Sequence, residues 1–323
     1  MMKFLDQAGW GHASAKPLAG DASTRQYQRL SLNGKSAILM QDPDGDVDLF
    51  ARLSRHLTGL GLSAPLILAQ APGLLLLEDL GDGLIANLSS DPDTEKTLYL
   101  TAVDALLELH QHPAPPDIPI ASPQTLAQVT DLVFDCYAAG AGADGSAYRD
   151  QAITAFIPIL EKHGAPCNVM IMRDYHAENI LWLPDRKGAA KAGLLDFQDA
   201  LVGHRAYDLI SLIEDARRDV RPATTKACID HYLANSSQGE TGFRTSLSVL
   251  GAQRNLRILG VFARLAATRG KPHYVDLIPR VWAHLQTDLQ HPALAPIKSI
   301  LDKALPPPTP DVLQRLKSLC PTP

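Results

Sequence analysis

Residues 170–199 read MIMRDYHAENILWLPDRKGAAKAGLLDFQD, and polar residues in this stretch stand beside apolar, strand-like runs. Asn179 follows Asp174 by five positions and directly precedes the run Ile-Leu-Trp-Leu. A turn rich in Pro, Gly and Lys separates that run from a second apolar segment, which carries Asp196. Two short strands joined by this turn would deliver three oxygen-bearing side chains to one place.

Such a set of side chains suits phosphoryl transfer. The transition state spreads charge over phosphate oxygens, so catalysis consists mainly of positioning, Mg²⁺ and a carboxylate that orients the attacking hydroxyl. Mg²⁺ takes oxygen ligands, usually one or two carboxylates together with the phosphates. The order Asp, Asn, hairpin, Asp-Phe is that of the catalytic and metal-binding residues of protein kinases. Each residue alone is equally explained as a turn residue or strand-end cap, so the interpretation depends on their combination.

Length and composition allow a full core and two lobes, because the chain has 323 residues of which 46% are hydrophobic. No apolar run approaches the roughly 18 residues of a membrane span. The N-terminus has Asp6 and Gln7 where a signal peptide needs an apolar segment, so we expect a cytoplasmic protein. Four widely spaced cysteines without a C-x-x-C motif predict free, mostly buried thiols.

Charge is distributed unevenly along the chain. Residues 201–323 hold 16 lysines and arginines against 10 aspartates and glutamates, a net +6, whereas residues 1–200 hold 14 against 25, a net -11. Such asymmetry biases which ligands approach which region. No basic cluster with interleaved aromatic residues occurs, so we expect no nucleic-acid partner.

The first quarter of the chain predicts strands. Asn33-Gly34 between apolar runs is a strong hairpin signal, and a second hairpin is predicted around residues 71–73. A helix is predicted between them at residues 46–60. The first loop is small and polar, so its backbone N–H groups and hydroxyls could cover phosphates, although an ordinary hairpin loop is an equal explanation. Its candidate residues are Gly20, Asp21, Ser23, Thr24 and Arg25.

Beyond a polar, Gly-rich segment at residues 78–83, the periodicity becomes helical. We interpret this segment as an inter-lobe hinge. The predicted architecture is therefore α+β in two lobes, a strand-rich lobe at 1–80 and a helical lobe at 81–323. Helices are expected at 93–112, 124–138, 146–163, 203–218, 222–234, 240–268 and 273–290.

The ordered motifs RDYHAEN (173–179), LLDFQD (194–199) and GHRAYDL (203–209) resemble those of the aminoglycoside phosphotransferase and choline kinase branch of the protein-kinase-like fold. The runs GDASTRQYQR (20–29) and LLLEDLGD (75–82) are similar to bacterial anomeric kinases acting on N-acetylmuramic acid and N-acetylglucosamine. The resemblance implies a small antiparallel-sheet lobe that binds nucleotide and a larger helical lobe with the catalytic loop and acceptor site. It implies ATP and Mg²⁺ as cofactors.

The resemblance also implies roles for the central stretch. Asp174 would be the catalytic base that accepts or orients the substrate hydroxyl, with Arg173 beside it in the catalytic loop. Asn179 and Asp196 would hold the Mg²⁺ that bridges the ATP phosphates. Asp208 would be a buried support hydrogen-bonded to the catalytic loop, although an ordinary helix N-terminal carboxylate explains it as well.

In the first lobe, the resemblance places the Gly20–Arg25 loop over the phosphates and the backbone around Glu78 and Leu80 at the adenine edge. One departure concerns the third strand, where Met40 stands in place of the phosphate-binding Lys of kinases. The following helix has no Glu to pair with such a Lys. Arg25, Arg29 and Lys35 are the available cations, and Arg25 is our first choice because it lies in the loop.

The main functional hypothesis is an ATP-dependent kinase of a sugar hydroxyl, most simply an N-acetylated amino sugar. An aminoglycoside 3'-type phosphotransferase is the alternative substrate class, but a polycationic acceptor would be repelled by the +6 region. A nucleotide-binding pseudokinase that regulates a partner is a second alternative, motivated by Met40. A metal-dependent hydrolase is a third, built on Asp174, His176 and Asp196, since His suits zinc or iron.

Overall fold

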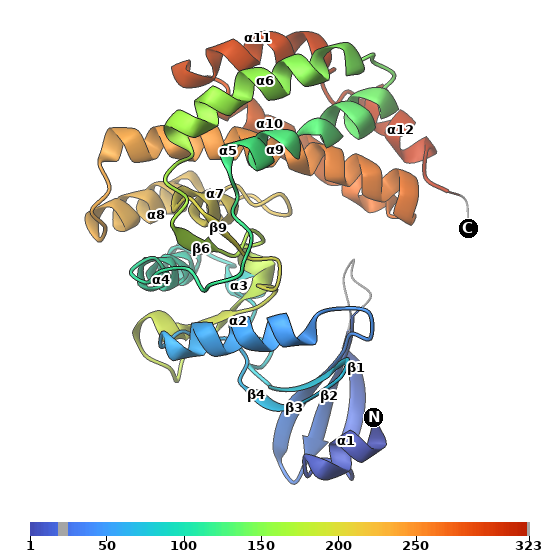
Figure 1. The fold of residues 1–323 in the computed structure, drawn as a ribbon, viewed down its shortest axis with the longest axis vertical. Coiled ribbons are helices and arrows are strands. Elements are labelled where there is room, and N and C mark those ends of the chain that lie inside the picture. Colours follow the sequence, from blue (N-terminus) through green and yellow to red (C-terminus); the bar gives the residue numbers. More distant parts are fainter. Residues whose placement is uncertain (19–24, 322–323) are drawn as a thin grey trace. The chain divides into compact units, whose positions relative to one another are not determined.

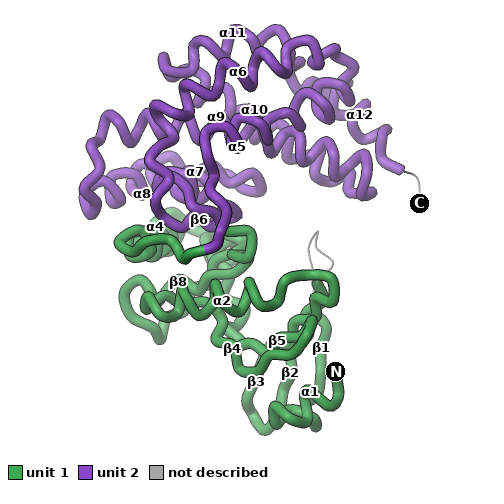
Figure 2. The backbone as a smooth tube through the Cα atoms, in the orientation of Figure 1, with its two compact units in different colours: residues 1–116, 177–200 green, residues 117–176, 201–323 purple. Residues whose placement is uncertain are grey.

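The computed structural model describes residues 1–18 and 25–321. The chain forms two compact units, each made of two separate segments (Figure 2). Unit 1 comprises Met1–Pro116 and Ala177–Ala200, and unit 2 comprises Asp117–His176 and Leu201–Pro323. These units are defined by packing, and the functional lobes expected at 1–80 and 81–323 stay a prediction.

A five-stranded antiparallel sheet dominates the start of unit 1 (Figure 1). Its first turn is the predicted Asn33-Gly34 hairpin, in which both residues have positive φ, 51° and 75°. This combination is typical of a type I′ turn, whose twist matches that of the flanking strands. The strand order is β1 (Ser14–Leu18), β2 (Gln26–Leu32), β3 (Lys35–Gln41), β5 (Leu74–Glu78), β4 (Ile67–Ala71).

Alternation along the strands separates two faces of this sheet. Leu30 pairs with Ala37, and both are buried together with Leu39 beneath side chains of helix α1 (Met2–Gln7) and the residues after it. Met40 points to the opposite face because successive strand residues alternate. It is only 1% exposed, so the position expected to carry a Lys is a buried apolar one.

Helix α2 (Val47–Gly59) follows β3 and begins at a side-chain cap. The Asp46 carboxylate accepts a hydrogen bond from the Leu49 amide at 2.8 Å, which satisfies one of the free N–H groups of the first turn. Phe50, Leu53 and Leu57 form the buried stripe of the helix. The helix predicted at 46–60 is confirmed.

A second hairpin joins unit 1 although it lies far along the chain. Strands β7 (Ile180–Trp182) and β8 (Ala192–Leu194) are antiparallel, as the 170–199 stretch predicted. The Leu194 amide donates to the Ser63 carbonyl, and the Trp182 amide donates to the Gly83 carbonyl, both at 2.7 Å. These main-chain bonds attach the hairpin to the first part of the chain. Unit 1 also contains helices α3 (Ile85–Leu88) and α4 (Pro92–Leu109).

Unit 2 is mainly helical and also contains a small strand pair (Figure 1). Strands β6 (Val169–Ile171) and β9 (Leu201–Gly203) are antiparallel. In the sequence, β6 precedes the predicted site residues of the 170–199 stretch and β9 follows them. The sequence analysis did not predict this strand pair. The helices are α5 (Pro123–Gln128), a π-helix (Val133–Ala138), α6 (Ser146–His163), α7 (Ala206–Ile213), α8 (Pro222–Ala234), α9 (Glu240–Arg269), α10 (Ile278–Asp288), α11 (Ala295–Ala304) and α12 (Pro310–Ser318).

Two helix predictions in unit 2 were too long. The helix expected to reach residue 218 ends at Ile213, because the buried Asp215 carboxylate accepts the Arg217 amide at 2.8 Å and forms a local turn. The helix expected at 124–138 is interrupted where the Thr130 hydroxyl donates to the Ala127 carbonyl at 2.7 Å. Short polar side chains thus compete with the helical backbone at both places.

All four cysteines are free, as predicted. Only Cys228 is fully buried, and the other three are half-buried, so the expectation of mostly buried thiols was too strong. Among the helices of the described residues, none combines the length and apolar character needed to cross a membrane.

Candidate active site

Asn179 and Asp196 lie together just beyond the ends of the β7–β8 hairpin. Ile180 pairs with Leu194, and one step further the Leu195 amide donates to the Asn179 carbonyl at 3.0 Å. The Asn179 side-chain nitrogen lies 3.4 Å from a carboxylate oxygen of Asp196. The hairpin therefore brings together the two residues predicted as metal ligands.

The backbone and the following phenylalanine direct the Asp196 carboxylate outward. Asp196 has φ 57°, in the left-handed region of backbone conformation that residues other than Gly rarely adopt. Phe197 is fully buried, and its ring packs against Phe50 of α2 with centroids 4.8 Å apart. The Asp196 side chain is 45% exposed. A strained residue next to a buried anchor fits a functional position better than an ordinary strand cap.

Arg25 is a cation of unit 1 that lies beside this pair. Its Nε donates to Asp42 at 2.9 Å, and its Nη1 lies 3.7 Å from Asp196 Oδ1. Asp42 had not been singled out, although the acidic run directly after β3 was an available signal. The other predicted loop residues, Gly20, Asp21, Ser23 and Thr24, lie outside the described residues.

The two other candidate cations have different environments. Arg29 forms ion pairs with Asp79 at 2.8 Å and Asp82 at 2.7 Å, and these hold the segment after β5. Hydrogen bonding to Arg29 lowers the pKa of Asp82. Lys35 is an exposed residue at the start of β3, directly after the Asn33-Gly34 turn. Of the three cations, Arg25 is therefore the one that the structure places beside a predicted metal ligand.

The side chain of Glu78 is engaged by unit 1 itself. Its Oε1 accepts a hydrogen bond from Arg186 Nη2 at 2.6 Å, and Arg186 also donates to the Ser63 hydroxyl. A nucleotide at this position would therefore meet the main chain of Glu78 and Leu80 rather than the carboxylate. This matches the expected backbone role, which stays a prediction.

The predicted catalytic loop, which lies in unit 2 up to His176, is held by a buried carboxylate. Asp208, in the first turn of α7, accepts hydrogen bonds from the backbone amides of Met172 at 2.6 Å and Arg173 at 2.9 Å. The Ser211 hydroxyl, one turn later, donates to the Arg173 carbonyl at 3.1 Å. Asp208 is completely buried. The predicted supporting role of Asp208 is confirmed.

These bonds maintain an unusual backbone at the residue before Asp174. Arg173 has φ 70°, which is strained for a long side chain. Burial raises the pKa of Asp208 to about 7, the two backbone N–H bonds lower it, and the nearby Asp174 carboxylate raises it. Both N–H bonds are donated to the carboxylate, and bonds of this kind stabilise its ionised form. The geometry therefore favours ionised Asp208 at neutral pH.

His176 is a packed, neutral residue in this structure. Its Nε2 lies 3.0 Å from Arg217 Nη1. Burial, together with the charges of Arg217 and Arg254, lowers the pKa of His176 well below its ordinary value. Within residues 1–18 and 25–321, no three or more His, Cys, Asp or Glu side chains are grouped to hold one metal ion. A cation beside His176 argues against the hydrolase alternative.

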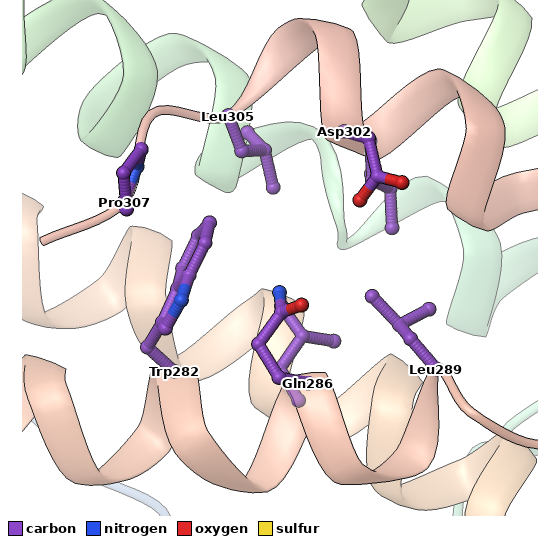
Figure 3. Close-up of a pocket in the computed structure, with 8 residues that line it drawn as sticks. Trp282, Gln286, Leu289, Asp302, Leu305 and Pro307 are labelled. Atoms are coloured by element: carbon purple, nitrogen blue, oxygen red, sulfur yellow. The ribbon is translucent and has the colours of Figure 1, made fainter.

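A hollow of about 380 Å³ lies between α10 and α11 in unit 2 (Figure 3). The Trp282 ring, Leu289 and Leu305 line it, with Gln286 and Asp302 as polar members. Asp302 forms an ion pair with Lys298 at 2.7 Å. No predicted site residue lines this hollow, and its largely apolar walls do not suit phosphoryl transfer.

Comparison with known proteins assigns the chain to a family. A family model described as "Phosphotransferase enzyme family" matches residues 14–244, which is more than half of the chain. The chain belongs to this phosphotransferase family. The phosphotransferase is 38% identical to the N-acetylmuramate/N-acetylglucosamine kinase of Caulobacter vibrioides, across 94% of this chain and 95% of that protein.

Solved structures similar to the phosphotransferase agree on its fold. A choline/ethanolamine kinase family protein from Mesorhizobium loti has a TM-score of 0.62 and 15% identity, covering 93% of this chain and 99% of that one. A spectinomycin phosphotransferase in complex with ADP and spectinomycin has a TM-score of 0.55 and 13% identity, covering 94% and 92%. The phosphotransferase therefore has the predicted two-lobed, kinase-like α+β fold.

Proposed function

We propose that this phosphotransferase transfers the γ-phosphoryl group of ATP to a hydroxyl of an N-acetylated amino sugar, with Mg²⁺ as cofactor. The pairing of Asn179 with Asp196 at the end of the β7–β8 hairpin is the observation that carries the proposal. Asp174 precedes Asn179 by five residues and follows a backbone held by Asp208. The printed name of the Caulobacter relative supports an amino sugar as acceptor.

The donor set of Asn179 and Asp196 fits Mg²⁺. A carboxylate and an amide oxygen are hard ligands, and Mg²⁺ needs only one or two carboxylates when phosphate oxygens complete its coordination. The Asp196 side chain is partly exposed and can exchange its present neighbours for an ion. When bound, Mg²⁺ neutralises charge on the phosphate oxygens.

The remaining roles follow from side-chain chemistry. The Asp174 carboxylate would orient the acceptor hydroxyl and accept its proton. Arg25, together with the Gly20–Thr24 loop, would bind the phosphates in place of a strand Lys at Met40. The presence of Arg25 near Asp196 weakens the motive for the pseudokinase alternative. A cytoplasmic location and the adenine contacts of Glu78 and Leu80 also stay predictions.

The decisive experiment is an acceptor screen with the full chain, Mg²⁺ and ATP. N-acetylmuramic acid, N-acetylglucosamine and kanamycin-type compounds are offered separately, and products are detected by mass. We expect phosphosugar from at least one amino sugar. Product from kanamycin-type compounds alone would exclude the proposed acceptor, and ATP binding without turnover of any acceptor would favour a pseudokinase.

Two variants separate the proposed roles in the same assay. Asp174→Asn should lower kcat by roughly 10²- to 10⁴-fold while ATP affinity stays nearly unchanged, because the carboxylate acts on the acceptor. Asp196→Ala should abolish the tightening of ATP binding by Mg²⁺, measured by calorimetry. Equal loss of ATP binding in both variants would contradict these separate roles.

A further inference from the structure

Arg29 lies on the same face of the five-stranded sheet as Met40. Residues paired directly across an antiparallel sheet present their side chains to one face. Arg29 pairs with Ile38 on β3, and Ile38 pairs with Leu77 on β5. Met40 follows Ile38 by two positions and shares this face. Arg29 is therefore a cation on the face where the resemblance placed the nucleotide.

The Arg29 guanidinium contacts the segment that directly follows β5. Its Nε and Nη2 lie 2.8 Å and 3.1 Å from the two carboxylate oxygens of Asp79. Its Nη1 and Nη2 lie 2.7 Å and 2.8 Å from the two carboxylate oxygens of Asp82. We call Arg29, Asp79 and Asp82 the clamp. A guanidinium is a rigid, planar fork, so these two bidentate pairs fix both carboxylates in direction as well as in distance.

The buried member of the clamp shapes the main chain of this segment. The Asp79 side chain is 6% exposed, whereas that of Asp82 is 79% exposed. Asp79 Oδ1 accepts the Gly81 amide at 3.0 Å, and Arg29 Nη2 donates to the Gly81 carbonyl at 3.4 Å. A buried carboxylate is costly without a cation, so Arg29 stabilises this turn. Two carboxylates against one guanidinium leave the clamp with a net negative charge, which does not suit phosphate binding.

The other end of the segment is attached to the β7–β8 hairpin. The Trp182 amide donates to the Gly83 carbonyl at 2.7 Å, and Leu84 forms an antiparallel bridge with Leu181. The segment is therefore held by the clamp on one side and by β7 on the other. Together these contacts limit the freedom of the main chain that follows β5.

We propose that Arg29 is a positioning residue for the nucleotide, because the clamp fixes the main chain of residues 78–80 in the geometry that pairs with an adenine edge. The inference rests on the proposed function, since it takes ATP as the phosphoryl donor. Main-chain N–H and C=O groups at fixed positions match one order of donors and acceptors. Adenine presents an amino donor where guanine presents a carbonyl acceptor, so the clamp favours ATP over GTP. A main chain that is already ordered also lowers the cost of binding.

The test measures the binding of ATP, GTP and adenosine to the full chain by calorimetry. Arg29→Gln should weaken ATP and adenosine alike, roughly 10-fold, because a smaller fraction of the protein presents the matching main chain. GTP should change by less than about 3-fold, so the preference for ATP falls. Arg29→Lys keeps the charge without the planar fork and should recover part of the loss. Arg55→Gln, at an exposed arginine of α2 that donates to Gln70 at 2.9 Å, is the matched control and should bind as the wild type does.

Asp82→Asn is a milder variant that removes the charge of the exposed arm and leaves the buried pair of Arg29 and Asp79 intact. It should weaken ATP and adenosine about 3-fold, less than Arg29→Gln does. Melting temperature shows whether each variant is folded, and Asp82→Asn keeps the test valid if Arg29→Gln does not fold. The KM of the acceptor at saturating ATP should stay within about 3-fold of the wild type, because the clamp acts on the base alone.

Three results would overturn the inference. Weaker binding of ATP and GTP with unchanged adenosine would make Arg29 a phosphate ligand. Equal weakening of ATP and GTP would show that the clamp does not act on the base edge, and unchanged binding of all three compounds would show that it does not act on the nucleotide. The binding measurement needs no acceptor, so a wild type that binds ATP but phosphorylates no sugar would refute the proposed acceptor alone.

Discussion

The two sets of predicted site residues are held by different kinds of interaction. In unit 1, Asn179, Asp196 and Arg25 lie at the ends of strands, and their side chains contact one another with partial exposure. In unit 2, the backbone preceding Asp174 is held by the fully buried carboxylate of Asp208. Groups that must exchange partners with a metal and phosphates gain from exposure, whereas a base that must point in one direction gains from a fixed backbone.

This difference predicts how each set responds to mutation. Partly exposed ion pairs contribute roughly 0–1 kcal/mol to stability because water and salt screen them. Buried carboxylates that accept backbone N–H bonds are costly to disturb, because an amide left without an acceptor loses roughly 1–3 kcal/mol. Changes at Asp208 should therefore affect both folding and turnover, and changes at the exposed Asp196 side chain should affect turnover with little effect on stability.

The largest effect is expected at Asp208, where Asp208→Asn would break the support of the loop. An amide has one acceptor oxygen, so either the Met172 or the Arg173 amide would lose its partner. We expect kcat to fall about 100-fold through misplacement of Asp174, and the free energy of unfolding to fall by roughly 1–3 kcal/mol. Steady-state kinetics and urea denaturation measure the two changes.

Ser211→Ala is the graded control for this variant, since it removes one hydrogen bond to the Arg173 carbonyl and leaves Asp208 intact. It should lose less activity and less stability than Asp208→Asn. If Asp208→Asn kept wild-type kcat, the fixed backbone would not be needed for turnover and the contrast between the two sets would disappear.

An intermediate effect is expected at Arg25. Arg25→Met should lower kcat/KM for ATP roughly 10- to 100-fold, because a cation facing the phosphates is lost. Stability should fall by roughly 1–3 kcal/mol, since the buried Asp42 carboxylate would lose the guanidinium that donates to it. Lys35→Met is the matched control and should behave as the wild type. A larger loss in the Lys35 variant would reverse our ranking of the cations.

The smallest effect concerns a carboxyl pair in unit 2, made of the half-buried Glu214 and the buried Asp288. The Asn255 side-chain nitrogen donates to Glu214 at 2.8 Å and to Asp288 at 3.0 Å. Burial raises the pKa of both carboxyls. The unfolded chain releases the Glu214 proton above the ordinary pKa of 4.5, whereas the folded state retains it up to a pKa of about 7. The free energy of unfolding of the wild type should therefore fall as pH rises from about 5 to 8.

Glu214→Gln removes that proton exchange, so the variant should lose less stability over the same pH range. Urea denaturation at several pH values measures the free energy of unfolding of both proteins. We expect the difference between variant and wild type to change by roughly 1–3 kcal/mol in favour of the variant between pH 5 and 8. The lowered pKa values of His204 and His284, about 4 in each, oppose this trend but act in both proteins alike. Glu240→Gln, an exposed substitution on α9, should parallel the wild type; parallel curves for Glu214→Gln would contradict the assignment.

Much of the fold was predictable because its signals are local. The Asn33-Gly34 turn, the cap at Asp46 and the change from strand to helical periodicity each act over a few residues. The helix ends near Asp215 and Thr130 were not predictable, because those side chains form turns only where the surrounding helices bury them. The β6–β9 pair was also missed, since its strands have only three residues each.

By itself, the sequence determined which two residues form the proposed metal-ligand pair of this phosphotransferase. A short hairpin places the residues before β7 and after β8 side by side, so Asn179 and Asp196 meet wherever the hairpin is. Only the tertiary structure decided which cation stands beside them, because Arg25 and Asp196 come from distant segments. Spacing along a chain specifies neighbours over one turn, whereas longer-range neighbours depend on which faces the packed elements bury together.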